Sequence, residues 1–488
     1  MRLKKFVAIG TAVVLSLSCV ACSSNSKKSN DKTTNNQPST EATDNASKGD
    51  DTSNDVDTSS NEALSYENIV LGESYTDIST TIKFYNNRTD LNQEDYSGKK
   101  WSDYVAEFNQ MYPNIKVEID ADTTYAESAL LRLQSGNYGD ILMIPEVDKT
   151  DLSKYFVSYG DIDTMNNQVR YATDMAYDGQ VYGVAYMGTA RGIVYNKAVF
   201  EKAGVTTLPT TPDEFIAALQ AIKDNTDATP LYTNYAAGWT MSAWDDYISG
   251  TATGDTTYKN QKLIHAKDPF ADQGNQTGPY AVYKVLYDAV AGGLTEDDFT
   301  TTDWEGCKGM INNGQIGCMV LGSWAYPQMV SAGDHGDDIG YMSFPVTVDG
   351  KQYASSGPDY RLGINKNSSE DNQKAAMVFV KWLTEKSGFA YNENGIPVGA
   401  NDDNFPELYK AFDGIELVSD DPAITGEEDL LNLINADSDL MVSAGGNTKV
   451  QQIIEHAANK DMTFDEIMAD WNAKWTSAQE ANSVTVNQ

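Results

Sequence analysis

The sequence is poor in the residues and motifs on which most enzymes depend. It has three histidines, and these are scattered along the chain at His265, His335 and His456. It contains no nucleophile elbow, phosphate-binding loop, HExxH motif or dinucleotide fingerprint. Its 71 acidic residues guarantee many chance carboxylate pairs, so no single pair indicates glycoside hydrolysis. We therefore expect no catalytic residue, no metal site and no cofactor, and predict that the protein is not an enzyme.

Cysteine is also scarce. Beyond the first 22 residues the chain has only Cys307 and Cys318. Two cysteines cannot form a framework of disulfides, nor a structural zinc site by themselves. A helix and the strand after it could bring the two thiols together in one bridge, and two separate buried thiols are the other interpretation.

Basic residues are outnumbered. Thirty-five lysines and arginines face the 71 acidic residues, which gives a formal net charge of -36. Such a surface repels nucleic acid and anionic lipid, and a polyanionic ligand would need a local basic pocket. We expect no nucleic-acid partner.

A retained transmembrane anchor is not indicated by the first residues. Arg2, Lys4 and Lys5 precede an apolar run from about residue 6 to 20, and the chain turns polar after Ala21-Cys22. This pattern predicts a cleaved signal peptide over residues 1–21. Cys22 follows a small residue and resembles the cysteine of a bacterial lipobox, which implies a lipid on Cys22 and a protein held at the outer face of the membrane. Lipidation of Cys19, or an ordinary cleaved signal with incidental cysteines, are the alternatives.

A tether is predicted from residue 22 to 62. Serine, threonine, asparagine, aspartate and lysine dominate this stretch, so little in it can offset the entropy cost of ordering. As a flexible coil it would span on the order of 35 Å. About 425 residues remain after it, which exceeds what one hydrophobic core usually supports and favours two lobes.

Strand and helix patterns alternate in the first part of this remainder. Ile82, Phe84 and Tyr85 indicate a strand that ends in a polar turn, and apolar residues then recur at helical spacing up to Pro113. Alternation over residues 115–119 completes a β-α-β unit. A second helix ends at Gly136, and the apolar run over residues 140–145 is typical of a buried parallel strand.

The same alternation returns later in the chain. Residues 192–195 and 316–321 indicate strands, and residues 211–214 and 463–466 each have the pattern of a helix-capping box. Residues 375–383 form an amphipathic pattern, and residues 430–475 are predicted to be helical. The fold class is therefore α/β.

Several aromatic residues stand in turn-like, polar contexts rather than on amphipathic stripes. Flat aromatic rings cover the C–H face of a sugar, while carboxylate, amide and guanidinium groups bond its hydroxyls. The pattern indicates a carbohydrate site, the alternative being that these rings fill the core or the walls of a cleft. The residues are Tyr85, Tyr186, Trp239, Trp244, Trp324, Tyr326 and Tyr360.

A series of short motifs in a defined order carries a family resemblance. The motifs are Phe108 to Pro113 with Ile115 to Val117, Gly139 to Ile141, Tyr182 to Tyr186, Val194 to Lys197, Phe200 to Gly204, Met319 to Trp324, Phe344-Pro345, Gly363 to Asn365 and Ala376 to Phe379. In this order, over about residues 81–475, the chain resembles the extracellular solute-binding proteins of carbohydrate ABC importers, the broad group that contains maltose-binding protein.

The resemblance implies a two-lobed periplasmic-binding-protein-like fold with three crossings between the lobes and a central ligand cleft. Lobe 1 would comprise residues 63–188 and 359–415, and lobe 2 residues 189–358 and 416–488, including the C-terminal helices. The ligand-binding residues carried over by position, together with the aromatic Tyr85, are Tyr85, Asn86, Asn87, Arg88, Glu146, Asp148, Tyr186, Trp239, Trp324, Asp359, Tyr360 and Arg361.

The function implied is that of a monomeric, lipid-anchored extracellular protein. It would capture a carbohydrate, in particular an oligosaccharide, and deliver it to the membrane permease subunits of an importer. An amino-sugar derivative, a peptide or a polyamine is the alternative ligand, although Arg88 and Arg361 argue against a polyamine. A surface glycoside hydrolase or adhesin is the alternative of another class.

Overall fold

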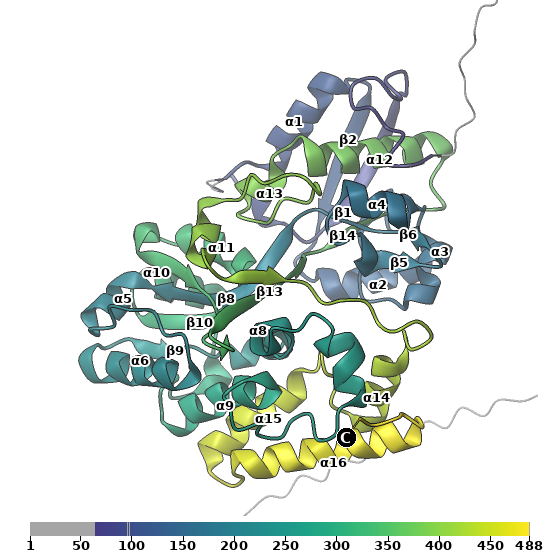
Figure 1. Cartoon of the computed structure of the whole chain (residues 1–488). Helices are drawn as coiled ribbons and strands as arrows, with labels where there is room; N and C mark the ends of the chain where they lie inside the picture. Colours follow the sequence, from purple (N-terminus) through teal and green to yellow (C-terminus); the bar gives the residue numbers. More distant parts are fainter. Residues whose placement is uncertain (1–63, 95, 97, 488) are drawn as a thin grey trace, which may run out of the picture. The chain divides into compact units, whose positions relative to one another are not determined.

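The computed structural model describes residues 64–94, 96 and 98–487 (Figure 1). Residues Glu62–Gln488 make up one compact unit. The predicted signal peptide, the predicted lipid site Cys22 and the predicted tether lie outside the described residues. Within the described ranges, no helix is both long enough and apolar enough to cross a membrane.

The first sheet contains the predicted β-α-β unit. Its strands run in the order β2-β1-β3-β14-β7. Strand β1 pairs in parallel with β2 and β3, whereas β14 runs antiparallel to both β3 and β7. The strands are β1 (Thr80–Asn86), β2 (Ile115–Ala121), β3 (Ile141–Met143), β7 (Val184–Ala185) and β14 (Arg361–Ile364).

Helices cover both faces of this sheet. Successive side chains of a strand point to opposite faces, so consecutive apolar residues of β1 need a partner on each face. Phe84 packs against Trp101 and Phe379, with ring centroids 5.4 and 6.1 Å away. Its neighbour Tyr85 packs against Tyr125 at 4.7 Å on the other face. The helices that carry these partners are α1 (Trp101–Met111), α12 (Glu370–Glu385) and α2 (Tyr125–Ser135), and the sequence predicts all three.

Short elements surround the first sheet. A small sheet has the order β4-β6-β5. These elements are β4 (Gly160–Asp161), β5 (Ala176–Tyr177), β6 (Gln180–Val181), α3 (Leu152–Tyr155), α4 (Ile162–Gln168) and α13 (Phe389–Asn392).

The second sheet is built around one long strand, β8. Its order is β12-β13-β8-β10-β9, with β11 also paired to β8 and β15 to β13. β8 runs antiparallel to β10, β11 and β13. The strands are β8 (Gly188–Asn196), β9 (Thr229–Leu231), β10 (Ile316–Gly322), β11 (Ile339–Met342), β12 (Thr347–Val348), β13 (Lys351–Pro358) and β15 (Glu416–Val418). The strands predicted at residues 192–195 and 316–321 are confirmed.

Helices cover the second sheet on both faces as well. In β10, Cys318 and Val320 join a core built with α6, α9 and α16, whereas Met319 and Leu321 join a core built with α10 and α11. Cys307 lies in the latter core, so the two cysteines are separate, buried free thiols. The helices are α5 (Lys197–Lys202), α6 (Pro212–Asn225), α7 (Trp239–Ser242), α8 (Gly250–Thr253), α9 (Gly278–Ala291), α10 (Trp304–Asn312), α11 (Tyr326–Val330), α14 (Leu430–Ser438), α15 (Asn447–Asn459) and α16 (Phe464–Ala481).

The two predicted capping boxes differ. At the start of α16, Thr463 and Glu466 bond each other's backbone N–H groups, as predicted. At the start of α6, Thr211 accepts from the backbone N–H of Glu214, but the Glu214 carboxylate accepts from Thr210 instead of Thr211. The box at residues 211–214 is therefore half formed, because the carboxylate reaches one residue further back.

Three segments lie side by side where the chain passes between the two large sheets. Gly188, at the start of β8, pairs with Pro358 of β13 and forms a bridge with Ile396. These are the three crossings of the fold. The predicted lobe boundaries stay a prediction. The segment η11 (Glu407–Phe412) packs on the second sheet, where Phe412 contacts Tyr341 at 5.6 Å.

Candidate ligand-binding site

The loop after β1 contains three of the predicted residues. Asn86 ends the strand and is fully buried. Its Oδ1 accepts a hydrogen bond from the backbone N–H of Arg88 over 2.9 Å, which turns the chain directly after the strand. Nδ2 of Asn86 and Oδ1 of Asn87 are buried without a hydrogen-bond partner among the described residues. Since buried polar atoms are nearly always bonded, this loop has one donor and one acceptor that no described residue pairs with, and ligand contact by Asn86 and Asn87 stays a prediction.

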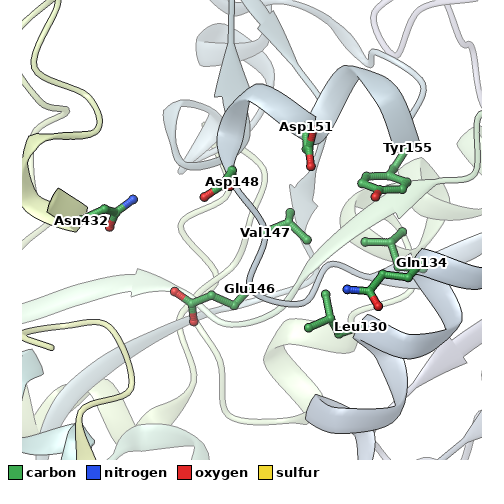
Figure 2. Close-up of a pocket in the computed structure, with 9 residues that line it drawn as sticks. Leu130, Gln134, Glu146, Val147, Asp148, Asp151, Tyr155 and Asn432 are labelled. Atoms are coloured by element: carbon green, nitrogen blue, oxygen red, sulfur yellow. The ribbon is translucent and has the colours of Figure 1, made fainter. Parts of the chain in front are cut away.

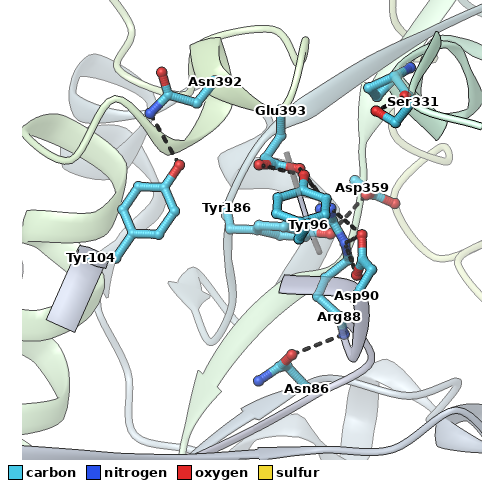
Figure 3. A network of polar contacts seen from close by, with 11 residues as sticks. Asn86, Arg88, Asp90, Tyr96, Tyr104, Tyr186, Ser331, Asp359, Asn392 and Glu393 are labelled. Atoms are coloured by element: carbon cyan, nitrogen blue, oxygen red, sulfur yellow. Dashed lines mark hydrogen bonds and ion pairs between the residues drawn. The ribbon is translucent and has the colours of Figure 1, made fainter. Parts of the chain in front are cut away.

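Arg88 is already occupied by protein partners (Figure 3). Its Nε donates to Oδ1 of Asp90 over 2.9 Å, and its Nη2 lies 2.6 Å from Oε2 of Glu393. The hydroxyl of Tyr96 donates to the same Glu393 oxygen over 3.0 Å. Burial lowers the pKa of Arg88, but the two carboxylates raise it by more, so the guanidinium stays charged. This geometry ties the β1 loop to Glu393, and ligand contact by Arg88 stays a prediction.

Tyr186 and Asp359 meet at the crossings. The Tyr186 hydroxyl donates to Oδ2 of Asp359 over 2.9 Å, and the Asp359 backbone N–H donates to the carbonyl of Met187 over 2.9 Å. Burial raises the pKa of the Asp359 carboxyl, although the Tyr186 hydrogen bond opposes this shift. The next two predicted residues, Tyr360 and Arg361, have other partners. Tyr360 packs on Tyr125, and Arg361 forms an ion pair with Asp174.

A row of aromatic rings joins two further predicted residues. Tyr85 packs on Tyr125, and Tyr125 packs on Tyr360 with ring centroids 5.8 Å apart. The Arg132 guanidinium lies 3.8 Å above the Tyr85 ring, and the Tyr85 hydroxyl donates to Asp122 over 3.0 Å. Tyr85 is only 1% exposed. Tyr85 is therefore a core residue that supports Tyr360 through Tyr125.

Trp239, Trp304 and Trp324 form a compact group that we call the tryptophan cluster. Their ring centroids lie 5.0, 5.6 and 5.8 Å apart. Trp239 is 41% exposed. Trp324 packs against the cores of both large sheets. The sequence predicts Trp239 and Trp324 but not Trp304, although Trp304 stands in the same kind of polar turn, after Thr302-Asp303.

Arg191 links the tryptophan cluster to the crossings and is absent from the predicted site. It pairs with Gly322 across β8 and β10. A Cβ atom on Gly322 would lie 2.5 Å from Nε1 of Trp324 and 3.0 Å from Nη1 of Arg191, so glycine leaves room for both side chains. Nε of Arg191 forms an ion pair with Asp246 at 2.8 Å. The positive charge of Arg191 also acts against the rise of the Asp359 pKa.

Glu146 and Asp148 lie apart from these groups, in a pocket of about 280 Å³. Figure 2 shows them on the loop after β3, with Leu130 and Gln134 of α2 on one side and Asn432 of α14 on another. Both carboxylates are exposed. Neither is bonded to a predicted site residue in the part of the chain described, and their role stays a prediction.

The candidate residues near the crossings comprise aromatic faces, amides and arginine–carboxylate pairs. In the described residues no group of three or more histidine, cysteine or acidic side chains is arranged to hold a metal ion. Stacking surfaces with neighbouring hydrogen-bonding groups suit a neutral, hydroxyl-rich molecule.

The chain matches known proteins over most of its length. Residues 93–388 match the family model described as bacterial extracellular solute-binding protein. A manno-oligosaccharide-specific solute-binding protein of Bifidobacterium animalis subsp. lactis, solved with mannotriose, is 54% identical, with a TM-score of 0.83 and coverage of 86% of this chain and 99% of that chain. A binding protein of an ABC transporter from the same organism, solved with mannobiose, is 55% identical, with a TM-score of 0.83 and the same two coverages.

A curated relative matches a shorter stretch. The diacetylchitobiose binding protein of Streptomyces coelicolor is 29% identical over 126 residues, which is 24% of this chain. The match spans 29% of the length of that relative.

Proposed function

The chain belongs to the family of bacterial extracellular solute-binding proteins, and from this premise we propose that it captures a manno-oligosaccharide and delivers it to the membrane permease of an ABC importer. The observation that carries the proposal is the similarity to two proteins solved with mannobiose and mannotriose. More than half of the residues are identical along nearly the whole of both proteins. A substrate shared with them is therefore the simplest proposal.

The site geometry supports a sugar. Trp239 offers an exposed ring for the C–H face of a pyranose, and Trp324 contacts the cores of both large sheets, where a ligand held between them would lie. The unbonded amide atoms of Asn86 and Asn87 suit hydroxyl groups, which both donate and accept. An anionic ligand would instead need a cationic group without a partner, and Arg88, Arg191 and Arg361 are all in ion pairs.

We further propose that the protein is anchored to the outer face of the membrane by lipid on Cys22, and that it acts as a monomer without catalysing a reaction. The tether predicted from residue 22 to 62 would let the binding domain reach both free sugar and the permease. Transport energy would come from a separate ATPase.

Calorimetric titration of the full chain with mannobiose, mannotriose, raffinose and diacetylchitobiose tests the ligand. We expect the two manno-oligosaccharides to bind, and to raise the free energy of unfolding by ~2.7 kcal/mol at a hundredfold excess over Kd. Binding of another sugar with no binding of either manno-oligosaccharide would overturn the proposal. Recovery of intact mannotriose after long incubation separates a binding protein from a glycoside hydrolase.

An amino-sugar ligand is the second candidate. The partial match to a diacetylchitobiose binding protein favours it. Tighter binding of diacetylchitobiose than of mannobiose in the same titrations would select this alternative.

A further inference from the structure

Asn447 lies beside the tryptophan cluster, although the sequence does not indicate it. It is the first residue of α15, and its Nδ2 lies 3.4 Å from the position that a Cβ atom on Gly238 would occupy. Gly238 has a φ of +72° and directly precedes Trp239. The carboxamide of Asn447 therefore covers the backbone from which the most exposed ring of the cluster projects.

This carboxamide has an unmet acceptor. Oδ1 of Asn447 is buried and has no hydrogen-bond partner within the described ranges. The same is true of Oδ1 of Asn234, a side chain only 1% exposed that lies four residues before Gly238. A carbonyl oxygen can only accept, and buried acceptors are almost always bonded. The missing partner of Asn447 must therefore be a donor.

Contacts of neighbouring residues anchor the helix α15, which begins at Asn447. Lys449, two residues further along the helix, forms a buried ion pair with Asp245. Gln451 donates through Nε2 to the carbonyl of Tyr235 over 3.2 Å, which ties α15 to the segment leading to Gly238. The helix that carries Asn447 is therefore anchored before a ligand binds, which lowers the ordering cost of binding.

We propose that Oδ1 of Asn447 accepts a hydrogen bond from one hydroxyl of the sugar ring that stacks on Trp239, which makes Asn447 a specificity-determining residue. This inference rests on the proposed function. A hydroxyl supplies the donor that the oxygen requires, whereas an ether oxygen or a carboxylate at the same place cannot. The site thus discriminates against a sugar that lacks that hydroxyl, because the buried acceptor would then stay unpaired.

Three variants of the full chain test the proposal by calorimetric titration. Asn447→Ala removes the acceptor, and we expect mannotriose to bind about tenfold more weakly. Asn447→Asp keeps an acceptor oxygen, and affinity should stay within roughly threefold of wild type, well short of the loss on removing a hydrogen bond. Asn459→Ala, at the exposed far end of the same helix, is the matched control and should bind as wild type does.

Monodeoxy analogues of mannotriose identify the hydroxyl. One analogue should lose affinity on the wild type and lose no more on Asn447→Ala, since both changes remove the same hydrogen bond. If wild type and Asn447→Ala bind mannotriose equally well, the partner of Asn447 Oδ1 is water and the inference is wrong. If Asn447→Ala has an altered melting temperature, the affinity of Asn447→Asp is the deciding measurement. A folded Asn447→Asp variant that binds mannotriose as weakly as Asn447→Ala also overturns the inference. Failure of the wild type to bind manno-oligosaccharides would instead overturn the proposed function.

Discussion

The hydroxyl of Tyr186 donates a hydrogen bond to Oδ2 of Asp359 over 2.9 Å, and this bond joins two of the three crossings between the large sheets. Tyr186 is 2% exposed, and Asp359 is partly buried. Burial raises the pKa of Asp359, and the tyrosine hydroxyl limits that rise by stabilising the carboxylate.

Tyr186→Phe should lower the free energy of unfolding by about 1–3 kcal/mol, because it leaves the partly buried carboxylate of Asp359 short of one donor. The pKa of Asp359 is above its ordinary 3.8 in the folded state, so the folded state binds more protons between the two values and stability falls as pH rises through that interval. The variant raises the folded pKa further. Urea unfolding should therefore show a larger loss at neutral than at mildly acidic pH, and an equal loss at both would contradict this. Tyr177→Phe, on the exposed strand β5, is the control.

Trp324→Ala should weaken binding of mannotriose by about 2 kcal/mol, which is roughly thirtyfold in Kd, because the ring forms part of the proposed stacking surface. Trp324 is only partly buried, so the melting temperature of this variant should fall less than that of a variant at a fully buried tryptophan. Trp244→Ala is the matched comparison, since Trp244 is 2% exposed and packs on Phe344. That variant should lose ~3 to 5 kcal/mol of stability. Normal binding by folded Trp324→Ala would remove this residue from the site.

Arg88→Met should lower the free energy of unfolding by about 3 kcal/mol, because it leaves Glu393 buried without its positive partner. Adding Glu393→Gln should recover part of the loss. The two single variants and the double variant, compared by urea unfolding, give the coupling energy directly. The exposed pair Lys410 and Glu407 is the control, and Lys410→Met should change stability by less than about 1 kcal/mol. Additive losses at Arg88 and Glu393 would show that the pair is not coupled.

His265 should make stability depend on pH. Its Nε2 lies 2.8 Å from Oε2 of Glu427 and its Nδ1 lies 2.8 Å from the carbonyl of Thr485. Burial lowers its pKa, but these two partners raise it by more, so the folded pKa is above the ordinary 6.5. The stabilisation is therefore complete below pH 6.5 and is lost as pH rises through the folded pKa.

We expect His265→Gln to lower the melting temperature more in mildly acidic than in alkaline buffer. His335→Gln, at an exposed position, serves as the comparison. A loss that does not change with pH would mean that His265 contributes only through uncharged contacts.

Cys22→Ala should release the protein into the medium, because the predicted lipid would have no attachment site. Immunoblots of the membrane and medium fractions measure this. Retention of Cys22→Ala in the membrane, together with release of Cys19→Ala, would move the lipid site to Cys19.

The sequence predicts those parts of the fold that local pattern determines. α1 and α12 repeat apolar residues at helical spacing, and β10 is a continuous apolar run, so each is visible in isolation. β13 reads Lys351-Gln-Tyr-Ala-Ser-Ser-Gly-Pro358, which has no strand pattern, and it forms because β8 and β15 pair with it. The pairing with β8 and β15 depends on residues far apart in the chain, whereas the hairpin with β12, closed by Asp349-Gly350, is a local signal that the prediction missed.

For the candidate site, the sequence indicates which residue types are suitable but not which of them are exposed or free of protein partners. Trp239 and Trp244 stand five residues apart in similar polar contexts, yet one is 41% exposed and the other 2%. The difference arises from tertiary partners, since Trp304 meets Trp239 and Phe344 covers Trp244. The ion pair of Arg88 could not be predicted from the sequence either, because its partner Glu393 lies about 300 residues away in the chain.

The tryptophan cluster also has a spectroscopic consequence. Three of the eight tryptophans of the chain lie within 6 Å of one another between ring centroids, and one of them is 41% exposed. A ring stacked against Trp239 would displace water from the indole that emits from the most polar surroundings. Intrinsic fluorescence of the unlabelled protein would therefore respond to an occupant at this one place, with the five other indoles as a constant background.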